Sequence, residues 1–157
     1  IEVIRVDGSE RRILVSNEGA NRSVRWSPDS NRIAYIFEDN GRTSVHVVNV
    51  DGTNNMRLTA VEGNEVGGWS PNGNSIAFSV REGEAKGIYK RNPDGVNEFR
   101  LTVNPDSNPI WSPDSTMIAF LSSKDGNPEI YTIEIDSGQE ERLTRNSVRE
   151  RPACVVS

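Results

Sequence analysis

The chain has 157 residues, a net charge of -5 at pH 7 and a sequence pI near 5.0, with its lysines and arginines dispersed. A nucleic-acid-binding protein would present a basic stripe or patch, and this sequence has none. No apolar run reaches the length that spans a membrane, and one cysteine excludes an internal disulfide bond. We therefore expect a domain that binds no nucleic acid and does not insert into a membrane.

The first fifteen residues predict two short strands, because apolar residues stand on both sides of a tight Asp-Gly turn at residues 7–8. Residues 16–59 then predict four strands, found just before Trp26 and in the runs RIAYIF, VHVVNV and MRLT. Pro28 occupies the second position of the turn SPDS, which joins the first strand to the second. This segment is therefore one complete antiparallel unit.

Residues 60–102 and 103–144 repeat this unit without insertion or deletion between the tryptophan and a Leu-Thr pair. The tryptophan and the turn proline recur at matching places: Trp26 and Pro28, Trp69 and Pro71, Trp111 and Pro113. A fixed period of about 42 or 43 residues is the signature of a repeat architecture. Residues 145–157 match only the start of a further unit, with Cys154 in the tryptophan position.

Four antiparallel strands repeated every 40 to 45 residues are typical of the blades of a β-propeller. No segment of ten or more residues has helical spacing of apolar positions, so the expected fold is all β. A β-sandwich would not explain a tryptophan at one fixed place in every repeat. We predict one partial propeller domain over residues 1–157, made of the back half of a blade (1–15), three complete blades (16–59, 60–102 and 103–144) and the first strand of another (145–157).

The repeat pattern W-S-P-[DN]-[GS]-x-x-I-A-[FY], then [IV]-[YH], D-G and R-L-T, resembles the WD-like repeat of the TolB family. It is also similar to the propeller repeats of tricorn-type and dipeptidyl-peptidase-type proteins. The TolB resemblance covers essentially the whole chain and implies half of a six-bladed propeller. It also implies a periplasmic or extracellular protein, although the sequence does not exclude the cytoplasm.

Three completions of this half propeller remain open. The chain is a piece of a longer polypeptide, or a second copy completes a six-bladed ring as a homodimer, or the two ends meet within one chain. The start at Ile1 and the stop in mid-repeat at Ser157 favour the first completion.

The residues that could carry catalysis all have structural interpretations. His46 falls where the sister repeats have Tyr89 and Tyr131, so we expect a third-strand side chain. The serines and acidic residues of the SPD turns recur because the turn needs them, and no G-x-S-x-G motif is present. Arg57, Arg100 and Arg142 recur before Leu-Thr and are interpreted as solvated side chains. We expect no catalytic residue, no cofactor and no metal ligand.

Length varies only in the connection from the last strand of one repeat to the first strand of the next. Loops on a rigid scaffold are where binding residues gather. The residues that lead into each first strand differ sharply between repeats, and we predict that they rim the central channel on this variable face: Arg22, Arg25, Glu65, Ser107, Asn108 and Glu150.

The sequence therefore favours a non-catalytic module that binds a protein or peptide partner. Two alternatives stay open: a propeller that gates access to a separate hydrolase domain of a prolyl-oligopeptidase-type or tricorn-type serine peptidase, and an extracytoplasmic sensor domain. Neither alternative has its own motif in this chain.

Overall fold

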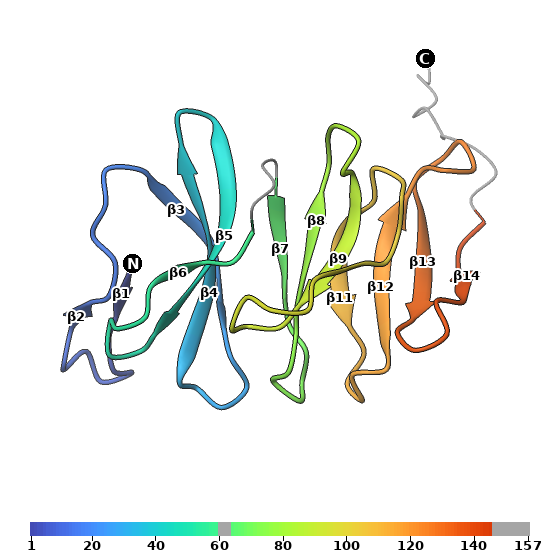
Figure 1. Ribbon diagram of the computed structural model, residues 1–157. Coiled ribbons are helices and arrows are strands. Elements are labelled where there is room, and N and C mark those ends of the chain that lie inside the picture. Colours follow the sequence, from blue (N-terminus) through green and yellow to red (C-terminus); the bar gives the residue numbers. More distant parts are fainter. Residues whose placement is uncertain (60–63, 146–157) are drawn as a thin grey trace, which may run out of the picture.

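The computed structural model describes residues 1–59 and 64–145, and within these ranges the chain forms strands, turns and loops but no helix. Four antiparallel sheets stand side by side in chain order (Figure 1). The prediction of an all-β, partial propeller is confirmed. Of the strand predicted in residues 145–157, only Arg145 is among the described residues, and Cys154 lies outside them.

The first sheet has two strands and each of the other three has four. Strands that follow one another in sequence are paired throughout each sheet, so every blade is a simple meander. The strands are, in the partial blade, β1 (Glu2–Val3) and β2 (Arg12–Ile13); in blade one, β3 (Ala20–Trp26), β4 (Arg32–Asp39), β5 (Arg42–Asn49) and β6 (Met56–Arg57); in blade two, β7 (Asn64–Trp69), β8 (Ile76–Val80), β9 (Gly87–Arg91) and β10 (Phe99–Arg100); in blade three, β11 (Ser107–Trp111), β12 (Met117–Ser122), β13 (Glu129–Glu134) and β14 (Glu140–Arg142).

In the SPD turn, side-chain oxygens accept hydrogen bonds from backbone N–H groups. The Ser27 hydroxyl donates to the Asp29 carboxylate at 2.5 Å and accepts from the Arg32 N–H at 2.9 Å. In blade three the same bond from Ser112, together with bonds from the backbone and side chain of Thr116, lowers the pKa of Asp114 to about 2. The bonds from the Arg32 and Thr116 N–H groups satisfy backbone donors at the turn, and the bonds between side chains hold the accepting oxygens in place.

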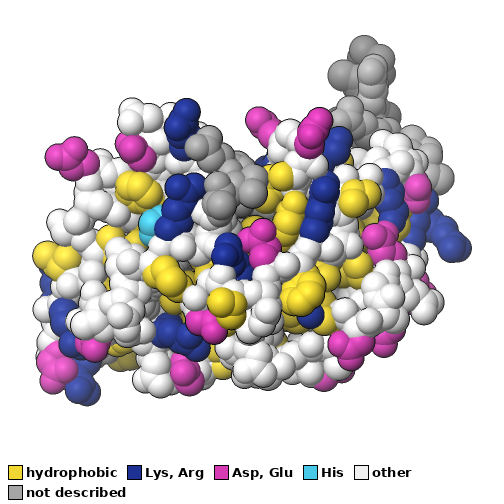
Figure 2. All heavy atoms as spheres, in the orientation of Figure 1, with side chains coloured by type: hydrophobic (Ala, Val, Ile, Leu, Met, Phe, Trp, Pro, Cys, Tyr) yellow, Lys and Arg dark blue, Asp and Glu magenta, His cyan; other side chains and the backbone are white. Residues whose placement is uncertain are grey.

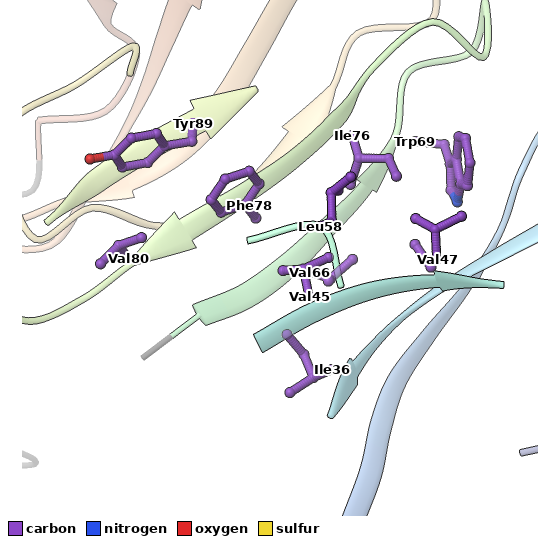
Figure 3. Close-up of a cluster of buried hydrophobic side chains, with 11 residues drawn as sticks. Ile36, Val45, Val47, Leu58, Val66, Trp69, Ile76, Phe78, Val80 and Tyr89 are labelled. Carbon is purple, nitrogen blue, oxygen red and sulfur yellow. The ribbon is translucent and has the colours of Figure 1, made fainter. Parts of the chain in front are cut away.

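Apolar side chains fill the space between neighbouring blades. The largest cluster lies between blades one and two, because alternate residues of β4 and β5 point towards blade two and alternate residues of β8 point back (Figure 3). Its fully buried members include Ile36, Val45, Phe78 and Val80. A second cluster joins blades two and three, and a third joins the partial blade to blade one.

The tryptophans of blades two and three pack against the blade before them. Trp69 is 8% exposed, donates its Nε1–H to the Arg25 carbonyl at 3.2 Å, and has the Arg32 guanidinium 4.9 Å from its ring centroid. Trp111 is half-buried in the second cluster. Trp26 differs, since it is 51% exposed. The partners of Trp69 come from a first and a second strand, and the two-stranded partial blade offers Trp26 neither.

The R-L-T motif ends the fourth strand with side-chain hydrogen bonds. The Nε of Arg57 donates to the Thr59 carbonyl at 2.6 Å, and the Val45 N–H donates to the Thr59 hydroxyl at 3.0 Å. Both bonds recur around Thr102 and Thr144. The recurring arginines therefore have a structural role in addition to solvent exposure, which corrects the interpretation of them as solvated side chains.

Candidate binding site

Each first strand carries a β-bulge at the same place. The register shifts between Arg22 and Arg25 in β3, between Val66 and Gly68 in β7, and between Ser107 and Ile110 in β11. The backbone adopts a positive φ within the shift, for example 54° at Ser23 and 53° at Asn108. A bulge bends its strand and changes the direction of the neighbouring side chains, so it decides where the residues that lead into the strand point.

The bulge of β7 also brings two first strands close together. A Cβ atom added at Gly67 would lie 2.1 Å from the carbonyl oxygen of Pro109 in β11. Only glycine permits this approach, because any side chain would collide with backbone that has no room to move. The inner edges of blades two and three therefore meet without space for a side chain.

A pocket with a volume of about 280 Å³ opens between blades one and two. It lies at the face that carries the β4–β5 and β8–β9 hairpin loops, which is the upper edge in Figure 1 and the face of variable connections. Its lining consists mainly of charged side chains and hydroxyl groups, with one aliphatic side chain: Arg22, Ser23, Ile36, Gly41, Thr43, Glu65, Arg81 and Glu82.

Both signs of charge meet in this pocket. Arg22 is paired with Glu38 at 2.9 Å, and since both are partly exposed, this ion pair orients the guanidinium more than it stabilises the fold. The Oε2 atom of Glu65 is buried and has no hydrogen-bond partner among the described residues. Arg81 and Glu82 are exposed at the rim. Figure 2 shows acidic and basic side chains mixed along the same upper edge.

The structure brings Arg22 and Glu65 together but not the other predicted site residues. Arg25 is exposed, bonds its side chain to the Val24 carbonyl, and uses its own carbonyl to hold a tryptophan. Ser107 and Asn108 lie one blade further along and do not line this pocket. Glu150 lies outside the described residues. The channel-rim role of these residues stays a prediction.

Arg81, Glu82 and Thr43 line the pocket but were not predicted. All three belong to the hairpins that join second and third strands, which share a face with the variable connections. The charged run REGEAK in the second hairpin was the available signal. It was missed because the repeat keeps a constant total length there, which hides differences between the hairpin loops.

His46 takes the place of the third-strand tyrosine. It lies opposite Tyr35 in the ladder, just as Tyr89 lies opposite Phe78, and the two rings are 5.4 Å apart. Burial, and then the nearby Arg57 cation, lower the pKa of His46. Within residues 1–59 and 64–145, no group of three histidine, cysteine or acidic side chains is arranged to hold a metal ion. The aromatic pairing gives this histidine a structural role.

Asp106, just before β11, has an unusual environment. Its side chain is buried, with the residue 1% exposed, and neither carboxylate oxygen has a hydrogen-bond partner among the described residues. The equivalent positions in the other repeats carry the neutral residues Asn21 and Asn64. A buried carboxylate without partners costs stability.

Repeated four-stranded blades, joined to their neighbours by clusters of buried apolar side chains, define the chain as a β-propeller domain. More specifically, the model of the TolB beta propeller domain family matches residues 1–156, and the chain belongs to that family. Within the part that the structure describes, no helix is long and apolar enough to cross a membrane.

Solved structures with the same fold include two TolB proteins, one of them putative, and the propeller domain of a protease. TolB from Acinetobacter baumannii superposes with a TM-score of 0.73 and 23% identity, over 92% of this chain and 37% of that one. The putative TolB from Agrobacterium tumefaciens gives 0.65 and 20%, over 92% and 69%. The β-propeller domain of the Trilobed protease from Pyrococcus furiosus gives 0.64 and 14%, over 92% and 48%. At these identities the similarity shows the fold, and the chain spans little more than a third of the Acinetobacter protein.

Proposed function

We propose that this chain is a non-catalytic module that binds a protein or peptide at its variable face. The observation that carries the proposal is the meeting of Arg22 and Glu65 in one pocket of about 280 Å³. Both stand four residues before the repeat tryptophan, where the repeats differ, while the scaffold around them is repeated. Variable side chains on an invariant frame are the arrangement that binding loops use.

The chemistry of the pocket supports a polypeptide partner. Arg22 and Arg81 suit carboxylates, whereas Glu65 and Glu82 suit amines or guanidinium groups. A nucleic acid or an anionic membrane would select a surface of one sign, and this rim mixes both signs. A segment that carries charges of both signs would match it, with charge complementarity setting specificity.

A peptide library displayed on phage and selected against the chain tests this proposal. The Arg81→Glu substitution should weaken a selected peptide by about tenfold, since it reverses an exposed charge at the rim. Arg5→Glu, an exposed arginine in the β1–β2 turn outside the pocket, is the matched control and should change affinity less than twofold. Enrichment of no peptide, or equal loss in both variants, would count against the proposal.

A second candidate is a propeller that gates access to a separate hydrolase domain. Its support is the shared fold with the propeller domain of the Trilobed protease. A gene that continues into a G-x-S-x-G region would favour this candidate over a stand-alone binding module. A periplasmic location, implied by the TolB resemblance, is part of the first proposal and is tested by cell fractionation.

A further inference from the structure

The β8–β9 hairpin, which carries two of the charged side chains of the pocket, is held in place by Arg100 of β10. The Nη2 atom of Arg100 donates to the Glu84 carbonyl at 3.0 Å and also to the Lys86 carbonyl. Its Nε atom donates to the Thr102 carbonyl at 3.0 Å. One guanidinium group therefore ties the hairpin to the end of the fourth strand of the same blade.

Further contacts hold the same hairpin. The Tyr89 hydroxyl donates to the Ala85 carbonyl at 2.7 Å, so three successive carbonyl groups of the hairpin accept bonds from Arg100 and Tyr89. The Ala85 side chain packs against the apolar cluster between blades one and two. A Cβ atom added at Gly87 would lie 2.0 Å from the Thr102 carbonyl oxygen. Glycine there lets the base of the hairpin approach the end of the fourth strand.

Blade three uses the equivalent two side chains in a different way. Tyr131 and Arg142 both bond to the Asp125 carboxylate of the β12–β13 hairpin, with 3.2 Å between Arg142 Nη1 and Asp125 Oδ2. That anchor depends on one aspartate. The anchor in blade two uses backbone carbonyl groups, which every residue has. The side chains of Arg81 and Glu82 are therefore not needed for the anchor and are available to a partner.

We propose that Arg100 is a positioning residue of the binding site, because its guanidinium group fixes the hairpin from which Arg81 and Glu82 enter the pocket. Arg100 does not itself line the pocket, so it acts through the hairpin. A hairpin that is loose in the free chain must be ordered when a partner binds, and that ordering lowers affinity. The effect on affinity rests on the function proposed above, whereas the effect on the hairpin does not.

A nitroxide label on the hairpin tests its position directly. Cys154→Ser removes the only cysteine of the chain, and Glu84→Cys places the label at an exposed hairpin position. Electron paramagnetic resonance then measures how fast the label tumbles. Arg100→Gln should shorten its rotational correlation time, because two carbonyl groups of the hairpin lose their donor.

Arg91→Gln is the matched control. Arg91 belongs to the same blade and also donates to backbone carbonyl groups, but these belong to Gly95 of the β9–β10 turn and to Leu58 of blade one. Its removal should leave the spectrum of the hairpin label unchanged, so a general loss of stability is separated from a loss of hairpin position. Circular dichroism checks that both variants keep the fold.

A selected peptide tests the link to binding. Arg100→Gln should weaken the peptide by about fivefold, since the loosened hairpin must be ordered on binding. In a chain that already carries Arg81→Ala and Glu82→Ala, the same change should cost less than about twofold, because Arg100 acts through those two side chains.

Two kinds of result would overturn the proposal. One is a label spectrum that stays the same in Arg100→Gln or changes equally in Arg91→Gln. The other is an undiminished loss of affinity in the chain that lacks both charged hairpin side chains, which would make Arg100 a direct contact of the partner. The label measurement needs no peptide, so a failure to select one counts against the proposed function and not against the position of the hairpin.

Discussion

Replacing Trp69 by alanine tests whether the repeat tryptophan is the main contact between blades. A buried tryptophan covers roughly 150 to 250 Å², which at about 25 cal/mol per Å² corresponds to roughly 4 to 6 kcal/mol. Truncation of buried aromatic residues costs about 3 to 5 kcal/mol, and Trp69 is 8% exposed. We therefore expect Trp69→Ala to lower the free energy of unfolding by about 3 to 5 kcal/mol.

Trp26→Ala is the matched control, because the same residue at the same repeat position is 51% exposed. It should cost about half as much, roughly 2 kcal/mol. Urea titrations followed by far-ultraviolet circular dichroism measure both, and the Trp69 variant should also melt about 10 °C lower. Equal losses in the two variants, or a loss below about 1 kcal/mol for Trp69, would refute the reasoning from burial.

Two further changes test buried polar groups. Asp106→Asn should raise the free energy of unfolding, measured by urea titration, by about 1 kcal/mol, since it replaces a buried carboxyl group that has no hydrogen-bond partner among the described residues with the residue of the sister repeats; a loss of stability would show that the carboxyl group is needed. The pKa of His46 is lowered in the fold, below its ordinary value of 6.5. The unfolded chain therefore takes up the proton first, and the melting temperature should fall as the pH drops below about 6.5. His46→Tyr should flatten this dependence, and an unchanged slope would contradict it.

The strands and turns were predictable from the sequence because they depend on local chemistry. Pro28 and its equivalents set the turns, and β-branched and aromatic runs set the second and third strands. The exposure of Trp26 was not predictable in this way, because burial depends on which neighbouring strands are present. The backbone hydrogen bond of Arg57 depends on where the chain goes after Thr59, which spacing alone does not give.

The candidate site was predictable only in part. Arg22 and Glu65 were found because matching positions in the repeats can be compared in sequence. Arg81 belongs to a hairpin, and its approach to Arg22 across the gap between blades follows from the packing of blade one on blade two. Asp106 shows the same limit, since a missing hydrogen-bond partner is a property of the folded surroundings.

The threonine hydroxyl at the end of each fourth strand fixes where strand pairing stops. The length of the connection that follows therefore does not affect the pairing within the blade. The Thr102 hydroxyl occupies the Ile88 N–H that a longer fourth strand would have used, so the ladder stops there whatever residues come next. Doubling the length of a loop costs only about 0.6 kcal/mol of closure entropy. New residues inserted after Thr102 would therefore leave the register of both blades unchanged, which makes this repeat a natural scaffold for displaying grafted peptides.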